Sequence, residues 1–501
     1  MTHSEKIFRN TIFSFGSKIV TIVLGFVTRK LFIVFLTEEL MGLNALFADL
    51  LGLLNLADMG LGIAVQFNLY KPLADKDEEK LGRILNAARR IYNIIGVGMI
   101  LAGIVLSFFI QFLIKENPYS LDFLRVVFII NVISSASSYF FVHKRLFMHA
   151  SEDIHVTNVV DIVMNLLSSV LKIVAIVVFK NYYLFIAINV IQSFVSNFMI
   201  GYYCDKKYPY LNKVKGYSKD EMGSLLSNIK ELVPNKISSF VYTNTDNTII
   251  SAFIGLASVT LFTNYTSIVT QIFMMAAMIA GVVKVSFGNV LQESTDKNQH
   301  MFFLNSYQML QFFYSSFCGV ALFCLLDEFV AFWYGEEFVI PLICVVLLTV
   351  DFYLHSMYQP LSMMLEVLGE FRPLKRQEIF AMIVNIIVSV ALIQVVGLAG
   401  PILGTLAVDI CTTIFRIYTV IYKHYRDYAK EYIFTYVKYV LVFGVEYVGL
   451  YYVCKILPLH PSFISIMLKG ILCFGVVMVA NIIIFRKKEE FSYLKNKLLR
   501  K

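Results

Sequence analysis

The sequence predicts an all-α integral membrane protein with about fourteen transmembrane helices, and three observations lead to this fold class. Hydrophobic residues make up 58% of the 501-residue chain, and its mean hydropathy is +0.70. Charged residues make up only 16% of the chain, against roughly 25% in soluble domains. Long apolar segments recur from one end to the other. A soluble protein of this length needs more polar residues to cover its surface, whereas a bilayer accepts apolar helices.

The boundaries of the predicted helices follow from their length, because about 20 mostly apolar residues are needed to span a bilayer. This criterion predicts two groups of six segments and a final pair. The first group is 9–35, 41–68, 91–114, 122–145, 157–179 and 182–204; the second is 233–255, 257–282, 304–327, 339–364, 377–397 and 401–422; the pair is 434–455 and 462–485. The first segment is too long for a signal-peptide core and lacks a small-x-small cleavage site, so we expect it to remain as a helix.

The connections between these segments alternate in charge. One set is rich in Lys and Arg and includes 71–90, 206–230, 423–438 and the tail from residue 486, whereas connections such as 328–338 contain no Lys or Arg. The positive-inside rule places the basic set in the cytoplasm. Both termini of a protein in the cytoplasmic membrane then lie in the cytoplasm, which requires an even number of spans. Basic loops beside anionic lipid also explain the net charge of +8 without any nucleic acid.

The two groups of six segments resemble each other when they are aligned so that Lys18 corresponds to Lys236 and Arg29 to Asn247. Both groups begin on the same side of the membrane, which predicts a parallel repeat with a pseudo-twofold axis along the membrane normal. Two six-helix lobes then face a central cavity, and the last two helices are an addition. The predicted domains are an N-lobe (1–204), a cytoplasmic linker (205–232), a C-lobe (233–422), and two further helices with a basic tail (423–501).

Basic residues inside the first helix of each group predict a hydrated, cationic cavity. Lys18 and Arg29 are eleven residues apart, which is about three helical turns, so they lie on one face. Lys236 and Asn247 repeat this spacing. A charge in the middle of a bilayer costs about 2.5–3.5 kcal/mol, so it needs a partner or water. Such a cavity would attract a pyrophosphate, whose oxygens match the fork of an arginine. The alternative is that both lysines extend to the cytoplasmic interface.

Polar residues of other helices extend this prediction. Asn55 and Gln66 of the second segment are also eleven residues apart, and we expect them to line the same cavity. Acidic residues within or at the ends of spans are candidates for binding a coupling proton or sodium ion, and Asp58 and Asp246 are the preferred ones. The alternative for each carboxylate is a pairing with a neighbouring base or a helix cap. The other acidic residues of this kind are Asp161, Asp351, Glu366 and Asp409.

The sequence gives no sign of an enzyme, a cofactor or a metal site. It contains no GxSxG, Walker, HExxH or DxD-like motif, so nothing indicates that ATP drives the protein directly. The predicted external connections are also too short to house a catalytic centre. The seven cysteines form no C-x-x-C pair and nearly all lie in apolar segments. We therefore expect them to be small residues of the core or the lipid-facing surface.

Several motifs resemble those of bacterial polysaccharide exporters, the Wzx-type flippases of the MATE-like (MOP) superfamily. They are Ala-Asp-Met-Gly-Leu-Gly-Ile-Ala at 57–64, Leu-Tyr-Lys-Pro-Leu-Ala-Asp-Lys-Asp at 69–77, Arg-Asn-Thr at 9–11, Tyr-Gly-Glu-Glu at 334–337 and Gly-Glu-Phe-Arg-Pro at 369–373. The resemblance extends over essentially the whole chain. It implies two six-helix lobes, inward- and outward-open states, and an undecaprenyl-pyrophosphate-linked oligosaccharide as cargo. The second lobe would carry less of the phosphate load, because Arg29 corresponds to a neutral asparagine there.

Other functions predict different features. The same resemblance also fits a lipid II carrier or a multidrug carrier. A multidrug cavity binds cations, however, and basic residues in it would repel them. A membrane polymerase or ligase for glycans needs a large external loop with catalytic residues. A purely structural scaffold has no use for buried charge. The sequence therefore favours a capsule or surface-polysaccharide flippase that works by alternating access, with membrane lipids around it.

Overall fold

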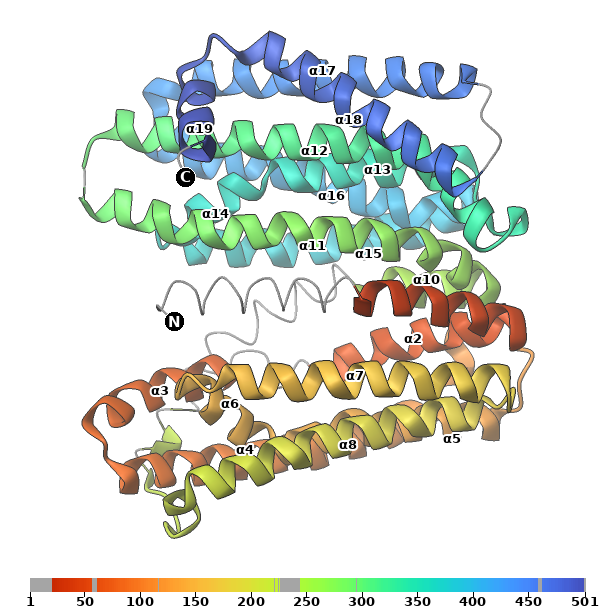
Figure 1. Cartoon of the computed structure of the whole chain (residues 1–501), viewed down its shortest axis with the longest axis vertical. Helices are drawn as coiled ribbons and strands as arrows, with labels where there is room; N and C mark the ends of the chain where they lie inside the picture. Colours follow the sequence, from red (N-terminus) through yellow and green to blue (C-terminus); the bar gives the residue numbers. More distant parts are fainter. Residues whose placement is uncertain are drawn as a thin grey trace. The chain divides into compact units, whose positions relative to one another are not determined.

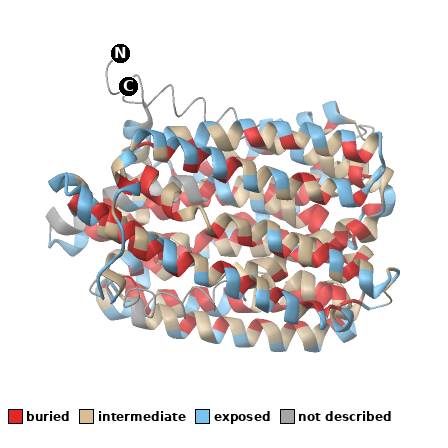
Figure 2. Ribbon diagram, turned by 90° about the horizontal axis from the view of Figure 1, so that it is seen from below, coloured by how far each residue is buried: buried red, intermediate tan, exposed pale blue. Residues whose placement is uncertain are grey.

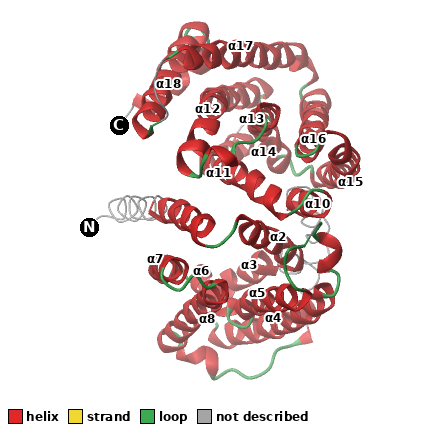
Figure 3. Ribbon diagram, turned by 90° about the vertical axis from the view of Figure 1, so that its right-hand side faces the viewer, coloured by secondary structure: helices red, strands yellow, loops and turns green. Residues whose placement is uncertain are grey.

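The computed structural model describes residues 20–55, 61–115, 117–219, 221–223, 225, 244–293, 295–457 and 462–499. These residues form α-helices joined by loops, and they include no strand (Figure 3). The chain divides into two compact units, Met1–Thr260 and Leu261–Lys501, here called unit 1 and unit 2. The predicted all-α class is confirmed for the described part of the chain.

The helices of the two units are labelled in Figure 1. Unit 1 contains a helix at 20–35, followed by α2 (Glu38–Leu54), α3 (Leu61–Asp75), α4 (Glu78–Ser107), α5 (Leu121–Tyr139), α6 (Val142–Ala150), α7 (Ile154–Val177), α8 (Tyr182–Lys207) and α10 (Asp246–Phe253). The unit boundary falls within α11 (Leu256–Glu293). Unit 2 continues with α12 (Lys297–Trp333), α13 (Leu342–Met357), α14 (Gln359–Val367), α15 (Phe371–Val396), α16 (Ala399–Ile417), α17 (Ala429–Ile456), α18 (Phe463–Phe485) and α19 (Glu489–Leu499).

Ten helical stretches among the described residues are long and apolar enough to cross a membrane. They include α4, α7 and α8 of unit 1 and α12, α17 and α18 of unit 2. The total of fourteen spans remains a prediction. Several helices begin earlier than their apolar segments do, because polar caps extend them: the Asp77 side chain accepts a hydrogen bond from the Lys80 amide (2.9 Å) at the start of α4.

Three segments predicted as single helices are each two helices in the structure. The segment 41–68 covers α2 and α3, and α2 ends where Asn55 caps it. The segments 122–145 and 339–364 are divided into α5 and α6 and into α13 and α14. Pro360 near the start of α14 explains the last division, because proline lacks the amide that a continuous helix needs. Hydropathy did not indicate these breaks, because it does not register an interruption of the helical hydrogen bonds. Leu342–Val367 still forms one helical stretch long and apolar enough to cross a membrane.

The predicted internal repeat is visible in the order and spacing of the helices. One constant shift along the chain carries the starts of α6, α7 and α8 onto the starts of α14, α15 and α16. Nearly the same shift carries the start of α4 onto that of α12 and the start of α2 onto that of α11. The packing also corresponds, because α5 contacts α4 and α8 in unit 1, and α13 contacts α12 and α16 in unit 2. The shift that aligns Lys18 with Lys236 in the sequence therefore agrees closely with a structural repeat.

The long helices bury one side and expose apolar residues on the other. On α18, Cys473 and Val477 are completely buried, whereas Ile464 and Ile471 are 69% and 64% exposed. Figure 2 shows exposed and buried residues along the same helices in this way. Contiguous apolar surface of this extent is typical of helices that contact lipid. The chain is therefore a multi-pass membrane protein.

Helices α15 and α16 approach each other closely at two glycines. A Cβ atom at Gly400 would lie 2.4 Å from the backbone nitrogen of Ile393, and one at Gly404 would lie 2.2 Å from the Ser389 hydroxyl. Backbone atoms cannot move aside as flexible side chains do. The close approach of α15 and α16, which carry part of the buried site described below, therefore requires a residue without a side chain at position 400.

We predict that Gly400→Ala destabilises the protein by about 1–3 kcal/mol, because the added methyl group overpacks the contact between the two helices. Thermal unfolding of the purified protein in detergent measures this effect. Gly449→Ala in α17 is the matched control, since a Cβ atom there meets nothing within 4 Å. Equal melting temperatures for the Gly400 and Gly449 variants would contradict the proposed packing.

Candidate functional site

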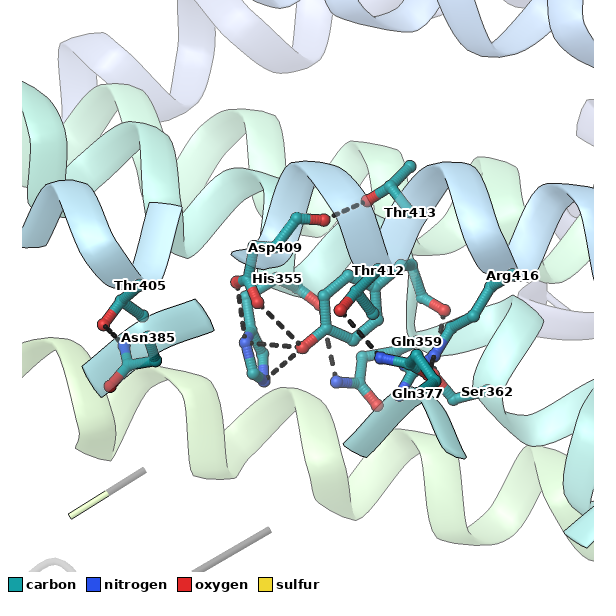
Figure 4. Close-up of polar contacts among 11 residues, drawn as sticks. His355, Gln359, Ser362, Gln377, Asn385, Thr405, Asp409, Thr412, Thr413 and Arg416 are labelled. Carbon is teal, nitrogen blue, oxygen red and sulfur yellow. Dashed lines mark hydrogen bonds and ion pairs between the residues drawn. The ribbon is translucent and has the colours of Figure 1, made fainter. Parts of the chain in front are cut away.

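A buried polar network lies inside unit 2, where α13, α14, α15 and α16 meet (Figure 4). We call it the Asp409 network. Its residues on α16 are three or four positions apart, so they share one helical face. Its members are His355, Tyr358, Ser362, Gln377, Asp409, Thr412 and Arg416.

One end of the network surrounds the Asp409 carboxylate, which is completely buried. Its Oδ2 atom lies 3.0 Å from His355 Nδ1, and its Oδ1 atom accepts a hydrogen bond of 3.4 Å from the Tyr358 hydroxyl. The same hydroxyl lies 2.8 Å from His355 Nδ1. The His355 side chain is 24% exposed, so it connects the buried carboxylate to the surface of the unit. A carboxylate in an apolar interior requires such partners.

The other end of the network surrounds the Arg416 guanidinium. Its Nε atom donates to Gln377 Oε1 (3.2 Å), and its Nη1 atom donates to the Ser362 hydroxyl. The guanidinium also lies over the Tyr358 ring, 4.3 Å from the ring centre, as in a cation–π contact. Gln377 in turn donates to Thr412 Oγ1 (2.7 Å). The Arg416 side chain is buried within unit 2.

Unit 1 contains a comparable arginine, which is half-buried. Arg145 of α6 makes two parallel hydrogen bonds to Asp161 of α7, at 2.5 and 3.0 Å. Ser196 of α8 donates to the same carboxylate (2.9 Å), and Asn197 accepts from Arg145 (3.4 Å). The bidentate geometry is the strong form of an arginine–carboxylate pair. Asp161 therefore follows the alternative interpretation of the sequence, a carboxylate paired with a neighbouring base.

Connections outside the spans add to these contacts. Asp153, just before α7, accepts hydrogen bonds of 2.6 Å from Lys207 and 2.5 Å from Tyr208, at the end of α8. Burial by itself would raise the pKa of this carboxyl, but the two hydrogen bonds outweigh burial and hold the pKa below its usual range. Asp153 is therefore ionised at neutral pH, and it fastens α7 to α8.

The structure describes some of the residues predicted for the cationic cavity. Lys18, Lys236 and Asp58 lie outside the described residues. Arg29 is half-buried in the helix at 20–35, and Gln66 is half-buried on α3. The predicted cavity therefore remains a proposal.

The other predicted residues make specific contacts within unit 1. Asn55 accepts hydrogen bonds from Ser135 (3.1 Å) and Tyr139 (3.0 Å) of α5. Asn247, in the first turn of α10, hydrogen-bonds Asp49 of α2, and Asp246 precedes it at the start of α10. Asn55 therefore contacts α5, and Asn247 contacts α2.

Sequence reasoning missed Asp49 and most of the Asp409 network. The sequence singles out Asp409, but not His355 or Gln377. The available signal was the spacing of Asp409, Thr412 and Arg416 along one face of a predicted span. Their partners come from three other helices, so the sequence does not indicate them.

A family model described as "Polysaccharide biosynthesis protein" matches the chain. This model matches residues 7–285, which is more than half of the chain. The chain belongs to this family. None of the curated protein sequences matches this polysaccharide biosynthesis protein. The resemblance noted in the sequence motifs is confirmed at the level of the family.

Solved structures with similar folds are transporters. The structure of the lipid II flippase MurJ in an inward closed conformation aligns with 95% of this chain and 99% of its own, with a TM-score of 0.73 and 14% identity. An inward-facing multidrug resistance MATE family transporter of the MOP superfamily aligns with 80% of this chain and 94% of its own, with a TM-score of 0.66 and 14% identity. At these identities the likeness shows the fold: this polysaccharide biosynthesis protein has the fold of MOP superfamily transporters.

We predict that Arg416→Lys destabilises the protein by about 1–3 kcal/mol, because lysine cannot form the fork that satisfies both Gln377 and Ser362 in a buried site. Thermal unfolding in detergent measures the loss. Arg426→Lys is the matched control, since Arg426 is exposed. The structural role assigned to Arg416 is wrong if both variants unfold at the wild-type temperature.

Proposed function

We propose that this protein is a transporter, and not an enzyme, that flips an undecaprenyl-pyrophosphate-linked oligosaccharide from the cytoplasmic to the outer leaflet. The cargo would be a repeat unit of a capsule or another surface polysaccharide. Membership of the polysaccharide biosynthesis family supports the sugar part of this cargo. The fold shared with MOP superfamily transporters supports alternating access as the mechanism. We further propose that the protein lies in the cell membrane with both termini in the cytoplasm.

A wholly apolar cavity in unit 2 is the observation that carries the lipid part of the proposal. Its volume is ≈ 410 Å³, and it is open to the surface of the unit. Helices α11, α12 and α18 line it, with side chains that include Ile272, Met275, Phe317, Ala321, Leu325 and Ile466. A site for a sugar or a soluble ion has polar groups that fix the ligand's orientation. A site without them fits a hydrocarbon chain, and the polyprenyl tail is the hydrocarbon part of the proposed cargo.

Basic residues are the proposed ligands of the pyrophosphate. Arg29 can fork onto two phosphate oxygens, and its half-buried position lets it pair with an anion at reduced exposure to water. Lys18 and Lys236 complete the proposed cationic group. Asn55, Gln66 and Asn247 are the proposed polar lining; these residues donate and accept hydrogen bonds, as the hydroxyl groups of a glycan require.

A proton or a sodium ion is the proposed coupling ion, with Asp58 and Asp246 as the candidate carriers. Asp246 lies in the first turn of α10, next to Asn247. Asp409 is less suited to this role, because His355 and Tyr358 already compensate its carboxylate. If Asp246 carries the coupling ion, transport by an Asp246→Asn variant should no longer depend on that ion. If Asp246 only caps α10, the ion dependence should be unchanged.

A lipid II carrier is the second candidate function. The fold match with the lipid II flippase MurJ extends over nearly the whole chain, and it favours a cargo with the same polyprenyl pyrophosphate anchor. A multidrug carrier of the MATE kind is less favoured, because Arg29 would repel cationic drugs. The two lipid-linked cargoes differ in their glycan, so competition between them in one assay distinguishes the candidates.

We predict that Ala321→Trp lowers transport by about tenfold or more, because the indole fills the apolar cavity and removes at least about 1.4 kcal/mol of tail binding. Appearance of a labelled undecaprenyl-pyrophosphate oligosaccharide on the far leaflet of reconstituted vesicles measures the flux. Ala391→Trp on α15 is the matched control, since Ala391 is exposed and outside the cavity.

Two results of this assay would contradict the proposal. Wild-type flux in the Ala321→Trp protein would remove the apolar cavity as a tail site. Transport of labelled lipid II at the oligosaccharide rate, with full mutual competition, would favour the second candidate function.

A further inference from the structure

Three cysteines from three helices converge inside unit 2. They are Cys324 of α12, Cys454 of α17 and Cys473 of α18, and all three are buried. Their sulfur atoms lie within 4.8 Å of one another, and the Cys454 and Cys473 sulfurs are 3.8 Å apart. The sequence gives no hint of this cluster, because Cys324 lies far from the other two along the chain. The expectation that the cysteines are small residues of the core or the lipid-facing surface does not include this arrangement.

Contacts around the cluster hold the same helices together. Lys469, one turn before Cys473 on α18, makes an ion pair with Glu328, one turn after Cys324 on α12. The Lys469 side chain is 4% exposed and the Glu328 side chain is 28% exposed, so the lysine is buried and the carboxylate reaches the surface of the unit. Further along the same two helices, Asn481 donates to the Ser316 hydroxyl (3.0 Å). These polar contacts fix the register of α18 against α12, so the positions of Cys324 and Cys473 are fixed as well.

We propose that Cys324, Cys454 and Cys473 form a binding site for one soft, thiophilic metal ion, with copper(I) as the physiological candidate. Thiolate ligands select soft cations such as copper(I). A metal–sulfur bond is about 2.3 Å long, so three sulfurs arranged in a triangle around one ion are separated by about 4 Å. The observed separations are close to this value, and only small side-chain movements are needed to bind the ion.

The number of ligands distinguishes copper(I) from zinc. Structural zinc sites are almost always tetrahedral with four protein ligands. Among the described residues, the group of ligating side chains at this place contains only the three cysteines. Copper(I) accepts two or three sulfur ligands, so it needs no fourth residue. Harder ions such as magnesium prefer oxygen ligands and do not fit a site made of sulfur.

A bound ion would connect the final helix pair to the rest of unit 2. Helices α17 and α18 follow the part of the chain in which the repeat is found, and both pack on α12. Metal ligation would join all three helices at one point and stabilise the folded unit, because a preformed site does not exist in the unfolded chain. This inference concerns the C-terminal pair and holds whichever cargo the protein carries.

Titration of the full-length protein with copper(I) tests the site directly. The protein is purified in detergent under reducing conditions and titrated with copper(I) buffered by a chromogenic copper(I) chelator. We expect one ion per chain and a rise in melting temperature on binding. Cys324→Ala, Cys454→Ala and Cys473→Ala should each bind copper(I) more weakly by at least about tenfold, as expected for the loss of one ligand. Monodisperse elution of each variant checks that it is folded.

Two buried cysteines outside the cluster provide matched controls. Cys318→Ala and Cys344→Ala should bind copper(I) as the wild type does. The proposal is overturned if the chelator removes all copper(I) from the wild type, or if the control variants weaken binding as much as the cluster variants. It is also overturned if protein isolated without reductant contains a disulfide between Cys454 and Cys473, because the cluster would then be a redox pair.

Discussion

Each unit of this protein depends on the pairing of an arginine within its own helices, half-buried in unit 1 and buried in unit 2. Hydrocarbon offers no hydrogen bonds, so a guanidinium that enters the interior must find all its acceptors there. Arg145 is satisfied by Asp161 and Asn197, and Arg416 by Ser362 and Gln377. In both units the arginine fastens a short helix, α6 or α14, to two long helices behind it. The apolar surfaces of those long helices can then face lipid, because their polar groups are paired inside.

The two units share a helix order but not the chemistry inside it. The shift along the chain that carries the start of α6 onto the start of α14 also carries Arg145 onto Ser362, so these residues hold corresponding positions. In unit 1 the short helix supplies the arginine, whereas in unit 2 the arginine comes from α16 and the short helix supplies its acceptor. The hydrogen-bonded contact between the short helix and its neighbours is thus present in both units, but the short helix donates in unit 1 and accepts in unit 2. The repeat therefore constrains packing, while the charged groups of each unit have diverged.

The sequence could predict the helices because each apolar segment carries its own signal. Helices such as α15 and α18 each contain an apolar stretch of eighteen residues or more, and capping residues such as Asp77 mark helix starts. The division at Asn55 could not be predicted, because the tertiary bonds from Ser135 and Tyr139 are not local. The Asp409 network and the three-cysteine cluster were missed for the same reason: each joins residues of different helices. Lys18, Asp58 and Lys236 lie outside the described residues, so the roles predicted for them stay predictions.

The central claim is that a basic side chain in the first helix binds the pyrophosphate of a lipid-linked glycan. The most direct measurement is the rate at which vesicles containing Arg29→Ala or Arg29→Lys protein translocate a labelled undecaprenyl-pyrophosphate oligosaccharide, normalised to the amount of inserted protein. We predict that Arg29→Ala loses most of the flux, since a neutral side chain cannot pair with the anion, and that Arg29→Lys retains part of it as a point charge. Wild-type flux in both variants would contradict the claim.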